Sequence, residues 1–139
     1  MEQRKILIAE DDAYGLMLIS DVLAHSDFAV ISAPDGLEAL RLVRAEKPDI
    51  VLMDIRMPKL SGLEVIRTMK ADAELRHIPV IALTVCVMKE EQRAVREAGA
   101  DAFVPKPCSM KELLTTIDSL LNAEDDADAA RGAAADEAS

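Results

Sequence analysis

The chain has 139 residues, carries a net charge of −10 and is half apolar, yet only three of its residues are aromatic. This length predicts one domain with an aliphatic core of its own. The negative charge argues against nonspecific binding to nucleic acid or to an anionic membrane, because both are negatively charged themselves. Two cysteines, no apolar leader at Met1–Arg4 and no apolar run as long as a membrane span favour a cytoplasmic protein.

Five short apolar runs recur along the chain, and each is followed by a segment with helical spacing. The runs are Ile6–Ala9, Phe28–Ser32, Ile50–Met53, Val80–Leu83 and Ala102–Val104. Several are continuous rather than alternating, as expected for strands that are covered on both faces. Five strand–helix units predict an α/β fold, with a doubly wound five-stranded parallel sheet and helices on both of its faces.

The helices that follow the second, third and fifth strands have clear start signals. A capping side chain precedes a glutamate by three positions in the pairs Asp35–Glu38, Ser61–Glu64 and Ser109–Glu112. In such a box the cap accepts from the free N–H groups of the first turn, and the glutamate bonds back to the N–H of the cap residue. The expected apolar stripes are Leu37, Leu40 and Val43; Leu63, Ile66 and Met69; and Leu113, Ile117, Leu120 and Leu121.

The ends of two helices are marked as well, and one helix is weakly amphipathic. Pro48 and Gly99 lie where the second and the fourth helix should stop. The fourth helix, roughly residues 88–98, has the weakest apolar stripe, which consists of Met88, Ala94 and Val95. A weakly anchored helix moves at modest cost.

The composition changes after Asn122, so we expect one folded domain in residues 1–122 and an acidic, alanine-rich tail in residues 123–139. Six of the 17 tail residues are acidic, which favours a disordered tail over an extension of the last helix, because acids oppose the dipole at a helix C-terminus. The tail is a passive extension or an acidic arm that screens Arg93 and Arg96. The first is favoured, since exposed charge pairs contribute only about 0–1 kcal/mol.

Polar side chains follow four of the five predicted strands. Glu10, Asp11 and Asp12 follow the first strand, Asp54 the third, Thr84 the fourth and Lys106 the fifth. Ligands of a doubly wound sheet bind outside the carboxyl ends of the strands, so these residues should share one site. Asp12 is better placed as the cap of the first helix than as a ligand.

These residue types suit a metal ion and a phosphoryl group. Carboxylates that are brought together repel one another and need a cation, and oxygen ligands of this kind suit Mg²⁺. A lysine and a hydroxyl can neutralise and bond the oxygens of a phosphoryl group. Asp54 is then a credible nucleophile that forms an aspartyl phosphate.

The same residues carry a family resemblance. Lys5-Ile6-Leu7-Ile8-Ala9-Glu10-Asp11-Asp12, then Asp49-Ile50-Val51-Leu52-Met53-Asp54-Ile55-Arg56-Met57-Pro58 with Gly62, then Thr84 and Lys106-Pro107 resemble the receiver domain of two-component response regulators. The resemblance covers residues 4–121 and implies the flavodoxin-like (βα)5 fold of receivers. The segments after Asp54 and at the start of the fourth helix are most similar to single-domain regulators of the DivK and CheY kinds.

The resemblance assigns a role to each residue of the site. Asp54 would be the phosphoacceptor, and Mg²⁺ would be held by Glu10, Asp11, Asp54 and the backbone carbonyl of Arg56. Thr84 and Lys106 would hold the phosphoryl oxygens, and the peptide bond before Pro107 would be cis. Phe103 stands at the position of the aromatic switch residue, although a phenyl ring there is also ordinary core material.

The implied function is that of a phosphorylation switch without enzymatic activity. A sensor histidine kinase or histidine phosphotransferase would phosphorylate Asp54, and the fourth helix, fifth strand and fifth helix would then present a changed surface to a downstream protein. No DNA-binding or enzyme module follows, so we expect protein–protein contact as the output. Two alternatives remain: a pseudo-receiver that is never phosphorylated, and an aspartyl-phosphate phosphatase. Arg56 counts against the phosphatase, which usually has a second aspartate there.

Overall fold

The chain forms a five-stranded parallel sheet with the strand order β2-β1-β3-β4-β5. The computed structural model describes residues 4–25, 28–56, 59–84, 89–105 and 111–122, so the predicted tail lies outside the described residues. The elements are β1 (Lys5–Ala9), α1 (Ala13–His25), β2 (Ala29–Ala33), α2 (Gly36–Glu46), β3 (Ile50–Asp54), α3 (Gly62–Ala71), β4 (Val80–Thr84), α4 (Lys89–Ala98) and β5 (Ala102–Pro105). A further helix covers residues 111–122. The predicted doubly wound α/β fold is confirmed.

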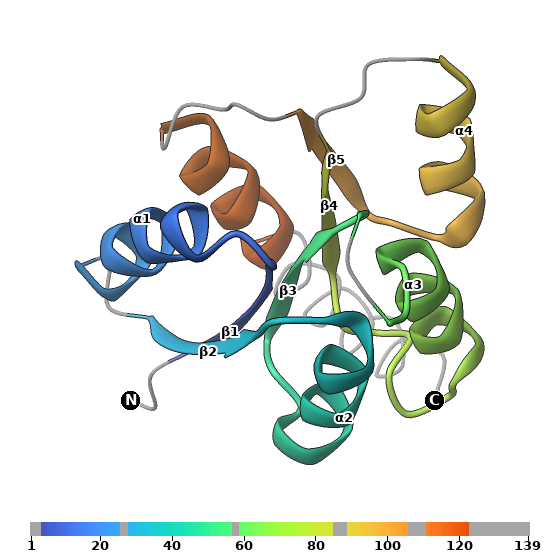
Figure 1. The fold of residues 1–139 in the computed structure, drawn as a ribbon, viewed down its shortest axis with the longest axis horizontal. Coiled ribbons are helices and arrows are strands. Elements are labelled where there is room, and N and C mark those ends of the chain that lie inside the picture. The colour runs from blue at the N-terminus through green and yellow to red at the C-terminus, as the bar shows by residue number, and fades with distance from the viewer. Residues whose placement is uncertain (1–3, 26–27, 57–58, 85–88, 106–110, 123–139) are drawn as a thin grey trace, which may run out of the picture.

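Helices cover both faces of the sheet. Successive residues of a strand point to opposite faces, so the apolar side chains of each strand pack in two separate cores. Leu7 and Ala9 of β1 pack in a core with α2, α3 and α4, whereas Ile6 and Ile8 pack with α1 and the helix of residues 111–122. Figure 1 shows the same division, with α1 and the last helix on one side of the sheet and the other three helices on the other side. Burial on both faces explains why the strands are continuous apolar runs.

The helix caps lie where the sequence predicts them, but the glutamates of the capping boxes bond elsewhere. Asp35 accepts from the N–H of Glu38 at 2.9 Å, and Ser61 accepts from the N–H of Glu64 at 3.3 Å. The predicted bonds from each glutamate back to the N–H of its cap residue are wrong. Instead, each carboxylate accepts from the arginine three residues further on: Glu38 from Arg41, and Glu64 from Arg67. An ion pair with a guanidinium is the stronger interaction for an ionised carboxylate. The third predicted cap, Ser109, lies outside the described residues.

The predicted helix ends are confirmed. α2 ends at Glu46 and is followed by Lys47, whose φ of 45° is in the left-handed region, and then by Pro48. α4 ends at Ala98, and Gly99 follows with a φ of 106°. A residue in this region turns the chain out of a helix, and glycine does so without steric strain.

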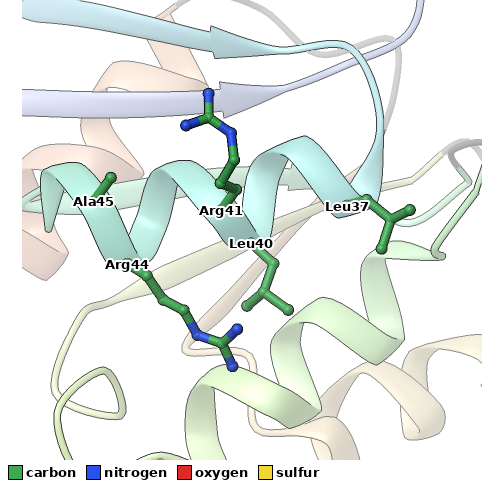
Figure 2. Close-up of a pocket in the computed structure, with 5 residues that line it drawn as sticks. All are labelled: Leu37, Leu40, Arg41, Arg44 and Ala45. Carbon is green, nitrogen blue, oxygen red and sulfur yellow. The ribbon is translucent and has the colours of Figure 1, made fainter.

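The predicted apolar stripe of α2 is partly wrong, because the helix turns Leu37 outward. Leu37 is 55% exposed, and the buried residues of α2 are Gly36, Ala39 and Val43. The backbone at Gly36 sets this rotation, since a Cβ there would lie 1.8 Å from the carbonyl oxygen of Leu60. Residues of α2 line a groove of about 460 Å³: Leu37, Leu40, Arg41, Arg44 and Ala45. Leu37, Leu40 and Arg44 extend on one side of the helix and Arg41 on the opposite side (Figure 2).

At the amino-terminal end of the sheet, a lysine and an aspartate tie three segments together. The ammonium of Lys70 on α3 donates to the carboxylate of Asp101 at 2.9 Å and to the backbone carbonyls of Arg76 and Ile78. The same carboxylate oxygen accepts from the N–H of Val80, at the start of β4. All three ammonium protons therefore have acceptors, and the aspartate has both a cation and a backbone donor.

No helix within the described ranges is long and apolar enough to cross a membrane.

Candidate functional site

The predicted site residues lie at the carboxyl ends of neighbouring strands. Glu10 and Asp11 follow β1, Asp54 is the last residue of β3, and Thr84 is the last residue of β4. β2 and β3 flank β1 on opposite sides, so the strand order changes direction at this point of the sheet. Ligand sites of doubly wound sheets lie at such switch points. The topology therefore brings together side chains that are more than 40 residues apart in sequence.

Three carboxylates form a tight cluster at this point. One oxygen each of Glu10, Asp11 and Asp54 lies within 4.8 Å of the others. Glu10 and Asp54 are buried, with 2% and 6% of their surface exposed, whereas Asp11 is exposed. Like charges this close repel one another, and a divalent cation would relieve the repulsion. A donor set of carboxylate oxygens that is open to water on one side fits Mg²⁺, which binds few protein ligands and keeps several waters.

Backbone N–H groups orient two of these carboxylates. The N–H of Asp12 donates to Oε1 of Glu10 at 3.2 Å, and the N–H of Arg56 donates to Oδ1 of Asp54 at 3.0 Å. The side chain of Asp12 has a different task, because it accepts from the N–H groups of Tyr14 and Gly15 at 3.3 Å. Asp12 thus caps α1, as its position in the sequence predicts.

The start of α3 packs directly against the backbone of the central aspartate. A Cβ at Gly62 would lie 2.2 Å from the carbonyl oxygen of Asp54 and 2.8 Å from Cα of Ile55. The N–H of Gly62 also donates to the carbonyl of Ile55 at 3.0 Å. Only a residue without a side chain allows this approach. Gly62 therefore fixes the segment that leaves β3, and with it the position of Asp54.

A fourth carboxylate at the same end of the sheet has a cation and a backbone donor as partners. Asp35 follows β2, and the ammonium of Lys59 lies 3.5 Å from its Oδ2 atom. The backbone N–H of Glu38, with a smaller contribution from Lys59, holds the pKa of Asp35 below its usual value. Asp35 is thus a structural acid that already has its partners.

The other predicted residues are placed only in part. Thr84 is buried, and it follows Leu83, which is the register partner of Asp54, so its hydroxyl belongs to the strand next to the aspartate. Phe103 of β5 is half-buried and lines a hollow of about 310 Å³ together with Val95 and Arg96 of α4. Lys106 and the predicted cis peptide bond before Pro107 lie outside the described residues.

One contact at the site has no signal in the sequence. The guanidinium of Arg56 donates to Oε1 of Glu91 on α4 at 3.1 Å, across 35 positions of the chain. The sequence analysis assigns only the backbone carbonyl of Arg56 to the site. A pair this far apart depends on how the loop after β3 meets α4, which no local pattern encodes.

Comparison with protein families shows the family of this chain. Residues 6–118 match the model of the response regulator receiver domain. This chain belongs to the response regulator receiver family. It is 42% identical over 118 residues to the polar-differentiation response regulators DivK of Brucella anthropi and Brucella abortus, which covers 85% of this chain and 96% of each relative. It is thus a two-component signalling protein, as the resemblance predicts.

Solved structures of receiver domains have the same fold. The receiver domain of the sensor histidine kinase PA1611 from Pseudomonas aeruginosa is 27% identical and superposes with a TM-score of 0.81 over 87% of this chain and 99% of that one. That structure contains a magnesium ion coordinated in its active-site cleft. The CheY-like receiver from Methanospirillum hungatei is 26% identical, with a TM-score of 0.85 over 90% of this chain and 98% of that one.

Proposed function

We propose that this receiver is a phosphorylation switch and that Asp54 accepts the phosphoryl group. The supporting observation is the cluster of Glu10, Asp11 and Asp54 at the switch point of the sheet. An oxygen of Asp54 attacks the phosphorus atom of a phosphohistidine, the P–N bond breaks, and the electron pair returns to the imidazole. Water later attacks the aspartyl phosphate, which restores the carboxylate and releases inorganic phosphate.

The carboxylates and one backbone group would hold Mg²⁺. Glu10, Asp11, Asp54 and the backbone carbonyl of Arg56 are the proposed protein ligands, and the bound ion supplies positive charge next to the transferring oxygens. The magnesium ion in the Pseudomonas aeruginosa receiver supports this assignment. Thr84 would donate its hydroxyl proton to one phosphoryl oxygen, and the ammonium of Lys106 would neutralise another.

The exposed side of α1 suits the approach of a protein phosphodonor. Among the described residues, the large apolar side chains that are exposed are Tyr14, Met17 and Leu18 on α1, and Leu37 on α2. Tyr14 is only three positions from Asp11. A donor protein that buries these side chains would bring its phosphohistidine to the acidic cluster. We therefore propose a sensor histidine kinase or a histidine phosphotransferase as the upstream partner, at a cytoplasmic location.

The output surface would be formed by α4, β5 and the helix of residues 111–122. α4 buries only Val95 and Ala98, so it is weakly anchored, and Phe103 lies beside it at the edge of a hollow. We propose that Phe103 shifts toward the interior when Thr84 contacts the phosphoryl group. The downstream partner would be a protein, with no role for nucleic acid or a membrane.

Intact mass spectrometry after incubation with Mg²⁺ and acetyl phosphate tests this function. The protein should gain one phosphate, which base removes, and Asp54→Asn should gain none. Asp118→Asn, which changes an exposed aspartate on the last helix, is the matched control and should be phosphorylated normally. Failure of the wild-type protein to take up phosphate would favour the pseudo-receiver, and catalytic hydrolysis of added phosphorylated substrates would favour the phosphatase.

A further inference from the structure

Arg56 makes one hydrogen bond through its backbone and another through its side chain. Its backbone N–H donates to Oδ1 of Asp54 at 3.0 Å, and its guanidinium donates to Oε1 of Glu91 at 3.1 Å. Glu91 lies in the first turn of α4. A single residue therefore connects the carboxylate that the proposed function phosphorylates to the helix that the proposed function moves.

The first half of α4 has little other apolar anchorage. The buried residues of this helix, Val95 and Ala98, are both in its second half, and Lys89 and Glu90 are exposed. The ion pair with Arg56 thus contributes to the docking of a segment that hydrophobic burial does not hold. Loss of the pair should loosen the first turn and leave the second half of the helix in place.

Phosphorylation changes what surrounds the guanidinium. It adds negative charge and three strong acceptor oxygens to Asp54, two residues before Arg56. The side chain of Arg56 is 64% exposed, so packing does not prevent it from moving. The planar fork of arginine bonds two phosphoryl oxygens at once, whereas an exposed pair with a carboxylate is weak.

We propose that the guanidinium of Arg56 leaves Glu91 and binds the phosphoryl group when Asp54 is phosphorylated, which releases the first turn of α4. Arg56 is then a positioning residue that transmits the state of Asp54 to the output surface. This inference rests on the proposed function. The proposed function uses only the backbone carbonyl of Arg56, as a ligand of the metal. The role of its side chain goes beyond that function.

The two partners of the ion pair should affect the phosphorylated state in opposite directions. In Glu91→Gln the guanidinium is no longer held away, so the fraction phosphorylated at a subsaturating concentration of acetyl phosphate should rise by about two- to fivefold. In Arg56→Gln the phosphoryl group loses a donor, so the fraction should fall by a similar factor. A pair with a purely structural role would shift both variants in the same direction, and that result would overturn the inference.

Hydrogen exchange in the amides of residues 92 and 93 provides the second readout, because the N–H groups before them, at the start of the helix, lack an intrahelical acceptor. Phosphorylation should speed exchange there in the wild-type protein, and both variants should show fast exchange already without phosphate. Arg67→Gln and Glu64→Gln break an exposed pair of the same chemistry on α3, at 2.7 Å, and should behave as wild type in both assays. Slow exchange in unphosphorylated Glu91→Gln would overturn the inference and leave the proposed function standing. Absence of phosphate on wild-type Asp54 by intact mass would overturn the proposed function together with it.

Discussion

Charged side chains gather at both ends of the sheet, but their surroundings differ. At the amino-terminal end, Lys70 and Asp101 form an ion pair, two backbone carbonyls accept the other ammonium protons, and the N–H of Val80 donates to the carboxylate. At the carboxyl end, Glu10, Asp11 and Asp54 place three negative charges within 4.8 Å of one another. Backbone N–H groups, those of Asp12 and Arg56, donate to two of these carboxylates.

The difference separates opposite charges that attract each other within the fold from like charges that a bound cation would neutralise. An ion pair that is partly buried and also bonded to backbone groups stabilises the native state relative to the state with one partner removed. A cluster of like charges lowers stability and is retained where a cation or a phosphoryl group completes it. Substitutions at the two ends should therefore have opposite effects on the free energy of unfolding.

Lys70→Met should give the largest loss of stability. The substitution keeps the apolar stem but leaves the carboxylate of Asp101 without its cation and two backbone carbonyls without a donor. We expect the free energy of unfolding to fall by about 2–3 kcal/mol, since the Lys70 side chain is only 18% exposed. Urea denaturation measures this, and Lys111→Met, at an exposed lysine, should change it little. Equal losses in the two variants would contradict a structural role for the ion pair.

Gly62→Ala should have the next largest effect, and it tests whether the backbone rather than charge holds the acidic site. An added Cβ would meet the carbonyl oxygen of Asp54 at 2.2 Å, so α3 or the end of β3 must shift. We expect a loss of about 1–3 kcal/mol, accompanied by slower phosphorylation of the displaced aspartate. In the control Gly15→Ala, the nearest atom is Oδ2 of Asp12 at 3.1 Å, at the end of a side chain that can yield. Stability of Gly62→Ala equal to that of the control would refute the prediction.

The sequence predicts the strands, the helix caps and the acidic cluster for physical reasons that are local or topological. Buried strands are continuous apolar runs, caps need particular side chains, and parallel topology brings the strand ends together. The sequence wrongly predicts that Leu37 is buried, because helical periodicity carries no information about the close approach of Gly36 to Leu60. The pairs of Lys70 with Asp101 and of Arg56 with Glu91 span more than 30 residues and depend on loop geometry.

Asp35 tests whether the partners of a carboxylate, rather than the end of the sheet at which it lies, decide whether it stabilises the fold. Its pKa is lowered in the folded protein by the N–H of Glu38 and by Lys59. The stability that this acid contributes is therefore present above the unfolded value of about 3.9 and is lost as the pH falls through the lower folded value. Asn caps a helix nearly as well but does not titrate. The melting temperature of wild type should exceed that of Asp35→Asn above pH 4, and the two should converge in stronger acid; a constant difference would contradict this assignment.

Asp11→Asn should have the smallest effect on stability in the absence of metal, and its sign is the most informative. The substitution removes one of three crowded negative charges, so the free energy of unfolding should stay the same or rise by about 0–1 kcal/mol. Mg²⁺ should stabilise the wild-type protein by an amount that grows with the logarithm of its concentration above the dissociation constant, because a ligand that binds only the folded state raises the free energy of unfolding. The variant should show little of this increase. Asp21→Asn, at an exposed aspartate of α1, should respond to Mg²⁺ as wild type does. Thermal denaturation with and without Mg²⁺ measures both quantities. A large loss of stability in metal-free Asp11→Asn would place Asp11 with Lys70 and Asp101 among the residues that hold the fold, and the contrast between the two ends of the sheet would fail at that residue.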